Sequence, residues 1–335
     1  MKSWRADPRQ VADPFAEQAL LPLKRKFNLL GIDIEFCSDS CDLLALADAA
    51  FADLPSQVHG GPALTVELRL LKSDLRYASE PPAARMVGGA GLLGAVMDAE
   101  NLALINVRGR HALVQVSEAL LAWPYHIRYE LIEFAVFTLA SRAQGYLALH
   151  AGCVGIDGNG ALLIGESGAG KSTLTLHALG EGLDFMTEDA CFVDPVSLRT
   201  TGIANYLHMR QDAVTWVGDT ALRNRILSAP IIRRRSGVEK FELNLRGGWA
   251  SLAAEPLRLA HFVFAAPAPA SDGELLRRLD AEELLHRLQL SQPYAASQPG
   301  WAVFAQRCAR LHGWELRRGS HPRAGALALK ALLMA

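Results

Sequence analysis

Apolar and polar positions alternate along much of the first third of the chain, with the period of two that is typical of β-strands. Residues 1–27 are polar and interrupted by prolines, so we expect a flexible segment there, and the paired prolines and paired glycines of 72–90 indicate a loop. Residues 28–123 are expected to form an α+β domain that binds a substrate or partner. Its sheet is expected to be small and antiparallel, because the connections between its last three predicted strands have hairpin lengths. Its predicted elements are a strand over 28–36, a helix over 43–51, and strands over 63–71, 92–98, 102–107 and 112–116.

A helical period replaces this alternation over 124–143, and Gly145 ends the predicted helix. A strand of small and apolar residues follows at 146–156. Because the sequence D-G-N-G at 157–160 is a tight-turn signal, this strand is expected to pair with the next one as a hairpin. Residues 124–335 are therefore expected to form a second domain, of the α/β (α+β) class. Its other predicted elements are strands over 203–209, 238–245 and 259–265, and helices over 281–290, 300–311 and 323–334.

The strongest local signal is a glycine-rich break between an apolar run and a helical pattern, with the form G-x-x-x-x-G-K-S. Glycines let successive backbone N–H groups turn towards one point, and the helix N-terminus adds the positive end of its dipole. Lys171 supplies a charge for the β- and γ-phosphates, and the Ser172 hydroxyl is placed to ligate Mg²⁺. The sequence thus predicts a site for ATP and Mg²⁺. The residues expected to bind the nucleotide are Gly165, Glu166, Ser167, Gly168, Ala169, Gly170, Lys171, Ser172 and Thr173.

An acidic pair, Glu188-Asp189, lies 16 residues past Ser172, at the end of the next expected strand. A phosphoryl transferase needs carboxylates to hold Mg²⁺ and, where the acceptor is a hydroxyl, to receive its proton. Adjacent strand residues point to opposite faces, so both carboxylates serve only if the strand ends or bends there. The alternative is a solvated surface pair. His150, in the strand expected to pair with the strand before the glycine-rich break, is either a core residue or a catalytic neighbour of the phosphates.

A kinase also needs cations where charge moves in the transition state. In 124–335, the expected catalytic domain, Arg210 follows the expected strand 203–209 and Lys240 lies in the expected strand 238–245, and either is a candidate to reach a phosphate. The basic run 233–235 is interpreted as a solvated, mobile loop. As an alternative, this loop becomes ordered over ATP or over an acidic substrate.

Composition and charge set limits on the class of protein. The chain of 335 residues has a formal net charge of −1, which provides no basic field for binding nucleic acid. Five scattered cysteines argue against a disulfide framework and favour a reducing cytoplasm, and Cys37 and Cys41 are interpreted as thiols rather than half of a zinc site. The N-terminus has no secretory pattern, and no apolar run of membrane-spanning length occurs, so no membrane partner is expected.

These motifs carry a resemblance to a known family. The run HAGCVGIDGNGALLIGESGAGKST, followed by FMTEDACFVD, resembles the core of HPr serine kinase/phosphorylase and its HPr-kinase-related relatives. The resemblance implies a phosphoenolpyruvate-carboxykinase-like ATP-binding core, with His150, the glycine-rich motif and the acidic pair at functional positions. It implies that Glu188 is the general base and that Asp189 binds Mg²⁺ together with Ser172. The sequence has Glu-Asp where authentic HPr kinases carry two aspartates, so the two roles are held to be exchangeable.

The resemblance is specific over 146–195, and the downstream glycine-rich signature of authentic HPr kinases is missing from 199–210. A closer likeness is to HPr-kinase-like enzymes that modify ribosomally made peptides, among them lasso-peptide kinases that phosphorylate a serine. The expected function is therefore an ATP-dependent kinase for a serine hydroxyl on a peptide or small protein. Two alternatives stay open, a kinase for a small-molecule hydroxyl and a nucleotide-gated regulatory module without transferase activity. A homo-oligomer is conceivable, since authentic HPr kinases form hexamers.

Overall fold

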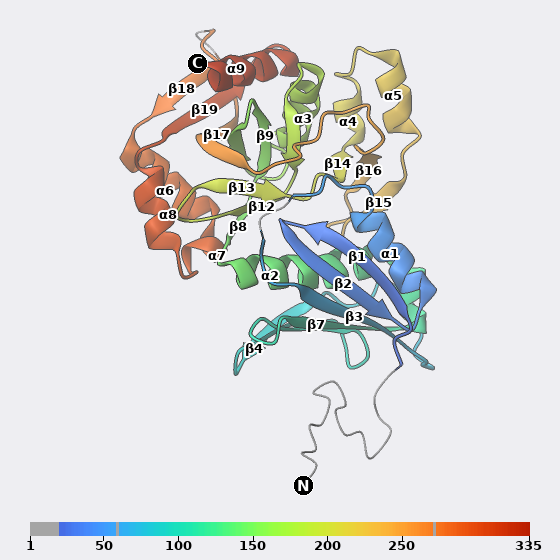
Figure 1. The fold of residues 1–335 in the computed structure, drawn as a ribbon. Helices are drawn as coiled ribbons and strands as arrows, with labels where there is room; N and C mark the ends of the chain where they lie inside the picture. Colours follow the sequence, from blue (N-terminus) through green and yellow to red (C-terminus); the bar gives the residue numbers. More distant parts are fainter. Residues whose placement is uncertain (1–19, 58–59, 271–272) are drawn as a thin grey trace.

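A computed structural model describes residues 20–57, 60–270 and 273–335 of the chain. In Figure 1 a seven-stranded sheet with its helices makes up the lower part of the molecule, and a nine-stranded and a three-stranded sheet make up the upper part. Helix α2 (Glu133–Gln144) lies between the two parts. The structure is thus a mixed α/β arrangement of several sheets and is compatible with the expected α+β class.

The seven-stranded sheet has the strand order β1-β2-β3-β7-β6-β5-β4. Strands β4 to β7 form the expected antiparallel meander, although β4 lies inside the predicted loop 72–90. The expectation of an antiparallel N-terminal sheet is wrong at its centre, because β2 pairs with β3 and β3 with β7 in parallel. Helix α1 (Cys41–Phe51) makes the crossover from β2 to β3. The strands are β1 (Leu23–Leu29), β2 (Ile32–Ser38), β3 (Leu64–Leu71), β4 (Arg85–Gly89), β5 (Leu92–Val96), β6 (Leu102–Asn106) and β7 (His111–Ser117).

The predicted strand over 28–36 is in fact parts of two strands. Leu30 and Gly31 have φ angles of 55° and 77° and form a tight turn between β1 and β2, which pair antiparallel. Positive φ at both central residues is the geometry that suits the twist of a two-residue hairpin. The turn was missed because Leu30 is apolar and continues the strand pattern. Part of the predicted flexible segment 1–27 therefore belongs to β1, while residues 1–19 lie outside the described residues.

The nine-stranded sheet has the order β11-β9-β10-β17-β13-β12-β8, with β19 paired to β17 and β18 to β19. Strands β9 and β10 form the expected hairpin, and β10 runs parallel to β17. The predicted strand over 146–156 divides into β8, which pairs with β12, and β9. The bounds are β8 (Leu147–His150), β9 (Gly152–Ile156), β10 (Asn159–Ile164), β11 (Asp184–Thr187), β12 (Ala190–Val193), β13 (Arg199–Gly202), β17 (Leu257–Pro269), β18 (Leu276–Leu279) and β19 (His312–Arg318).

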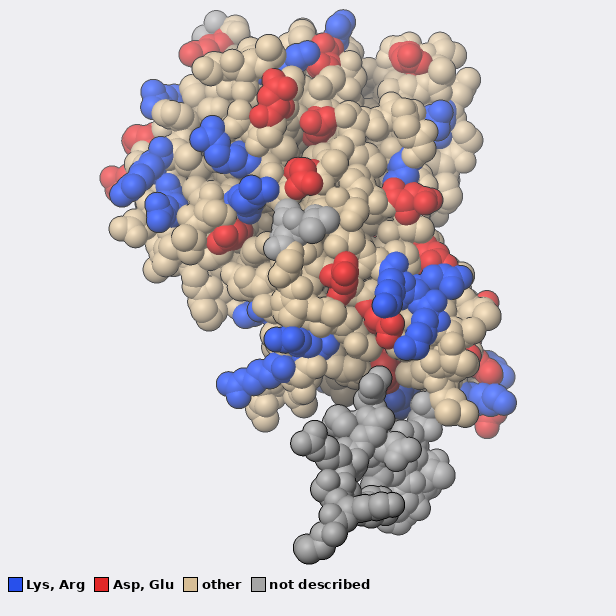
Figure 2. Space-filling model, viewed as in Figure 1, with Lys and Arg blue, Asp and Glu red and all other residues tan. Residues whose placement is uncertain are grey.

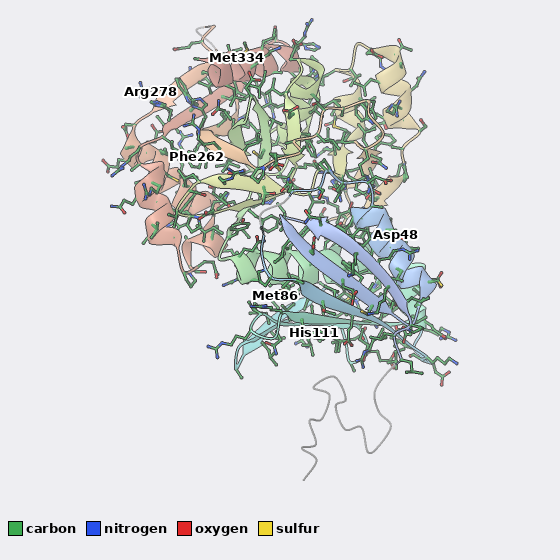
Figure 3. The ribbon with its side chains drawn as sticks, viewed as in Figure 1. Asp48, Met86, His111, Phe262, Arg278 and Met334 are labelled. Atoms are coloured by element: carbon green, nitrogen blue, oxygen red, sulfur yellow. The ribbon has the colours of Figure 1, made fainter. Side chains whose placement is uncertain are left out.

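Helices cover both faces of this sheet. Leu174 of α3 and Leu329 of α9 pack together on one face, and Leu284 of α6 and Phe304 of α8 pack on the other. Phe262, labelled on β17 in Figure 3, is fully buried within the second of these cores. The bounds are α3 (Lys171–Gly180), α6 (Ala281–Ser291), α7 (Pro293–Ala296), α8 (Trp301–Cys308) and α9 (Pro322–Met334), so the three predicted C-terminal helices are confirmed.

The helix predicted over 124–143 begins as a π-helix, η2 (His126–Ile132), and continues as α2. Gly145 ends it in the left-handed conformation with φ of 71°, as expected of a helix C-cap. Ile127, Leu131 and Leu139 pack into the core of the seven-stranded sheet. A short 3₁₀ helix, η1 (Glu118–Ala122), precedes η2 in the chain. Segments of π-helix in proteins often occur at functional sites.

A small sheet with the order β14-β16-β15 stands beside the start of α3. Its core joins Leu207 of β14 and Phe241 of β16 to Leu176 of α3 and Ile226 of α5. This packing brings side chains of β14 and β16 next to the glycine-rich segment that precedes α3. The elements are β14 (Tyr206–Met209), α4 (Gln211–Val214), α5 (Thr220–Leu227), β15 (Ile231–Arg233) and β16 (Glu239–Asn244).

The surface carries both signs of charge. Figure 2 shows Lys and Arg side chains interspersed with Asp and Glu over the face that it draws. Met86, labelled on the edge strand β4 in Figure 3, is 61% exposed. Among the described residues, no helix combines the length and apolarity needed to cross a membrane.

The hairpin that leads into the glycine-rich loop packs tightly enough to test. A Cβ at Gly155 of β9 would lie 2.4 Å from the Asn159 carbonyl oxygen and 2.6 Å from a Leu257 methyl group. We expect Gly155→Ala to lower the free energy of unfolding by about 1–3 kcal/mol, because the core must shift to admit the methyl group. Urea unfolding followed by circular dichroism measures the change.

Gly180→Ala in α3 is the matched control, since a Cβ there meets nothing within 4 Å. This variant should be as stable as the native protein or more stable, by about 0.4–1 kcal/mol. Equal stabilities of the two variants would contradict the close packing of β9.

Candidate active site

A cavity of about 570 Å³ opens where the start of α3, the end of β14 and the β15–β16 hairpin meet. Its volume is within the range of sites that hold a ligand of drug or nucleotide size. Most of the site residues predicted from the sequence come together around it, although they lie on six different elements and connections. Those that line the cavity are His150, Glu166, Ser167, Gly168, Ala169, Gly170, Lys171, Ser172, Thr173, Asp189, Arg210 and Lys240.

The glycine-rich loop, Gly165–Gly170, joins β10 to α3 as expected. Gly168 and Gly170 have φ of 86° and 97°, and a Cβ at either would point into open space. Only glycine adopts this backbone readily, so the loop can bend around a bound group. The Lys171 ammonium folds back and donates to the carbonyl oxygens of Gly165 and Glu166, at 2.5 and 3.3 Å. Burial lowers the pKa of Lys171, which places a partly desolvated cation beside the loop.

Glu188 and Asp189 occupy the connection between β11 and β12, so the strand does end where the acidic pair begins. Their side chains go to different places. The Ser172 hydroxyl donates to Glu188 Oε1 at 2.5 Å, and Glu188 is only 6% exposed. Glu188 is thus a buried carboxylate beneath the first turn of α3, while Asp189 faces the cavity.

Asp189 forms an ion pair with Arg234, at 3.0 Å. Burial alone would raise the pKa of Asp189, but the charge and hydrogen bond of Arg234 outweigh it and hold that pKa below its usual value. His150 and Lys240 lie close enough to add to this effect. Asp189 is therefore an ionised carboxylate that faces the same space as the glycine-rich loop.

Glu188 has a second partner, His208 of β14. Glu188 Oε2 accepts from the His208 backbone N–H at 2.9 Å and lies 2.5 Å from ring Nδ1. Burial would lower the pKa of His208, but the carboxylates of Glu188 and Glu242 outweigh it and raise it to about 9. The ring is therefore a cation between two buried acids.

A buried polar cluster continues from His208 to the π-helix η2. Ring Nε2 lies 2.9 Å from the Tyr129 hydroxyl, which also donates to Glu242. The Arg128 guanidinium binds Glu242 and stacks on the Tyr129 ring. Burial raises the pKa of Glu133 to about 7 against the opposing charge of Arg128, from which its Oε1 is 3.7 Å away.

The other predicted cations have different surroundings. Lys240 of β16 is half-buried at the cavity, and burial lowers its pKa. Arg210 is 51% exposed and pairs loosely with Asp212 at 3.4 Å. His150 is exposed at the end of β8. His150 was expected in the strand that pairs with β10, but that strand is β9. His150 instead pairs with Ala190 of β12, the residue that directly follows the acidic pair.

The interpretation of 233–235 as a solvated loop is wrong for Arg234 and Arg235, and residue 233 is the last residue of β15. Arg234 is held by Asp189, and Arg235 forms a two-nitrogen ion pair with Glu130 at 2.6 Å from each nitrogen. Arg235 also donates to the carbonyl oxygens of Pro81 and Pro82, in the connection between β3 and β4. The Arg235 contacts hold the β15–β16 hairpin against Glu130 and the connection between β3 and β4. The local sequence gives no signal for partners so distant along the chain.

The residues at the start of α3 fit a magnesium ion bound with a nucleotide. Ser172 and Glu188 present a hydroxyl and a carboxylate oxygen 2.5 Å apart. Mg²⁺ prefers oxygen ligands, and beside phosphates it usually takes only one or two protein carboxylates. Among the described residues no group of three or more His, Cys, Asp or Glu side chains forms a cage for a metal by itself. The two oxygen donors of Ser172 and Glu188 suit an ion whose other ligands are phosphate oxygens and water.

Sequence reasoning missed His208, Arg128, Tyr129 and Glu242. Two weak signals were present, the first of which is that His208 lies between two apolar residues, Leu207 and Met209. Lys240 and Glu242 also share a face of β16 by their spacing of two. Neither signal identifies a partner, since the contacts depend on how β14, β16 and η2 pack together.

Comparison with known proteins finds a distant similarity to a solved structure. No family model matches the sequence, and no curated protein matches it. The chain is similar to the Hpr(Ser) kinase/phosphatase from Coxiella burnetii at 13% sequence identity, over 56% of this chain and 93% of that one, with a TM-score of 0.28. At this level the similarity carries no inference about activity.

Glu133 provides a pH test of the buried cluster. With a pKa near 7 in place of its ordinary 4.5, folded Glu133 keeps a proton that the unfolded chain has lost. The stability from this group is fully present below pH 4.5 and is lost as the pH rises through 7. We expect Glu133→Gln, which does not titrate, to exceed the native protein in free energy of unfolding above pH 7, on the order of 2 kcal/mol.

Urea unfolding of both proteins at pH 4.5, 6 and 8 measures this difference, which should shrink towards the lowest pH. Metal-free buffer with a chelator keeps the comparison independent of ligand. A difference that stays constant across the three pH values would contradict a raised pKa at Glu133.

Proposed function

We propose that this protein is a phosphotransferase that uses ATP and Mg²⁺ to phosphorylate a hydroxyl group, with a serine of a peptide or small protein as the acceptor. The observation that carries the proposal is the division of the acidic pair. Glu188 contacts the Ser172 hydroxyl beneath the start of α3, whereas Asp189 lines the cavity. A hydroxyl kinase needs these two carboxylates in separate places, one towards the metal and one towards the acceptor.

The contacts support roles opposite to those that the family resemblance implies. Glu188, in contact with Ser172, is assigned to the metal side. Asp189, which faces the cavity near His150, is assigned to the acceptor side as the group that receives the hydroxyl proton. When bound, Mg²⁺ supplies charge neutralisation on the β- and γ-phosphates.

The residues of the chain then act as follows. The backbone N–H groups of the glycine-rich loop and the Lys171 ammonium hold the phosphates. The acceptor oxygen forms a bond to the γ-phosphorus, the bond from that phosphorus to the ADP oxygen breaks, and the hydroxyl proton passes to Asp189. Because this transition state is loose, the proton leaves late, and a carboxylate of low pKa is a sufficient base. Lys240 and Arg234 lie at the cavity to stabilise the transferred charge.

The choice of a serine on a peptide or small protein rests on the resemblance of 146–195 to serine kinases, including those that modify lasso-peptide precursors. A small-molecule hydroxyl kinase would use the same residues with another acceptor. A nucleotide-gated regulatory module would have no need of Asp189 facing the bound phosphates.

Transfer is tested by incubating the protein with ATP, Mg²⁺ and serine-containing peptides and looking for one added phosphate by mass spectrometry. We expect Lys171→Ala to abolish transfer, because it removes the cation that holds the phosphates. Asp189→Asn should slow transfer by about 10²–10⁴-fold, the usual contribution of a general base, while ATP still binds.

Asp157→Asn is the control, since it makes the same chemical change in an exposed turn at the far end of β10. It should leave transfer unchanged. Full activity of Asp189→Asn would refute the assignment of the base. Tight ATP binding by the native protein without transfer to any peptide would favour one of the two alternative functions.

A further inference from the structure

The two oxygens of Glu188 are divided between different partners. Oε1 accepts from the Ser172 hydroxyl at 2.5 Å, whereas Oε2 accepts from the backbone N–H and ring Nδ1 of His208, at 2.9 and 2.5 Å. A carboxylate that is held at one oxygen by two N–H donors has little freedom to rotate. Its other oxygen therefore stays beside Ser172, where a divalent cation is proposed to bind.

The far side of the His208 ring is held as well. Nε2 lies 2.9 Å from the Tyr129 hydroxyl and 3.8 Å from Glu242 Oε1. Arg128 in turn binds Glu242, and its guanidinium lies over the rings of Tyr129 and Tyr206, at 4.2 and 4.7 Å from their centroids. The His208 side chain is 9% exposed. The imidazole is thus fixed in position and orientation by π-helix η2 and strand β16.

We propose that His208 is a positioning residue that orients Glu188 for Mg²⁺ and so sets the affinity of the site for the metal, an inference that rests on the proposed function. His208 acts through Glu188 rather than on the phosphates. Groups that hydrogen-bond to a metal-binding side chain typically contribute 10–100-fold to metal affinity. A purely structural role would instead change stability without changing the dependence of nucleotide binding on Mg²⁺.

Two substitutions of His208 distinguish the contacts made by its ring Nδ1 from those made by its ring Nε2. Asn places an N–H donor close to the position of Nδ1, so His208→Asn keeps the contact with Glu188 and loses the contacts of Nε2. Gln places its donor close to the position of Nε2, so His208→Gln keeps the contact with Tyr129 and loses the one with Glu188. The backbone N–H of residue 208 is present in both variants and cancels in the comparison.

The experiment measures binding of a non-hydrolysable ATP analogue by isothermal titration calorimetry, in chelator and over a series of Mg²⁺ concentrations. The apparent Mg²⁺ affinity of the nucleotide-bound protein should fall about 10–100-fold in His208→Gln and much less in His208→Asn. In chelator, both variants should bind the analogue as the native protein does, because the glycine-rich loop and Lys171 are unchanged.

Thermal unfolding of the ligand-free proteins reports separately on folding. If His208→Gln fails to fold, Tyr129→Phe replaces it, since it leaves the ring in place but frees Nε2 from the Tyr129 hydroxyl. The Mg²⁺ affinity of Tyr129→Phe should fall, but by less than the 10–100-fold expected for His208→Gln. Its binding of the analogue in chelator should be unchanged.

Equal Mg²⁺ affinities in His208→Gln and His208→Asn, whether native or reduced, would overturn the inference. So would a native Mg²⁺ affinity in Tyr129→Phe, where that variant is the one tested. Failure of the native protein to bind the analogue under any condition would instead refute the proposed function, and the inference would fall with it.

Discussion

The burial of one carboxylate beside the start of a helix is the constraint on which the site depends. Glu188 is 6% exposed, and a buried charge is tolerated only when it is paired and hydrogen-bonded. Ser172 and His208 satisfy it from two sides, and Glu242 then balances the charge of His208. Each partner belongs to a different element, so α3, β14 and β16 must meet at this point for the carboxylate to be stable.

The chain of buried contacts also makes the N-terminal part of the molecule a structural component of the site. Ile127 and Leu131 of η2 pack in the core of the seven-stranded sheet, and Arg128 of the same helix binds Glu242 of β16. On the exposed side, Arg235 holds the β15–β16 hairpin to Glu130 and to the connection after β3. The domain boundary predicted after residue 123 places η2 in the catalytic domain. The apolar face of η2 nevertheless packs on the sheet of the N-terminal domain. The boundary itself stays a prediction.

The geometry of the glycine-rich loop was predictable because it is local, whereas the partners of the other site residues depend on distant elements. The glycine-rich loop and Lys171 lie within a few residues of one another, so their geometry follows from one strand–loop–helix unit. The pairing of β2 with β3 in parallel was missed because alternation has the same period in parallel and antiparallel strands. Arg234 was interpreted as solvated because nothing in a run of three arginines marks the one that meets Asp189.

The cations that line the cavity include two partly buried lysines and an arginine that is paired with a carboxylate. Burial lowers the pKa of Lys171 and of Lys240, because a charged ammonium loses hydration there. Arg234 is neutralised by Asp189, whereas the ion pairs described for this chain include no carboxylate partner for either lysine. The burial of these two ammonium groups has an electrostatic cost, which Glu188 and Asp189 offset in part and which, under the proposed function, a bound polyanion would offset further. Under the proposed function, cations that are already desolvated lose less hydration when phosphoryl charge develops beside them, which is the property that a transfer site requires.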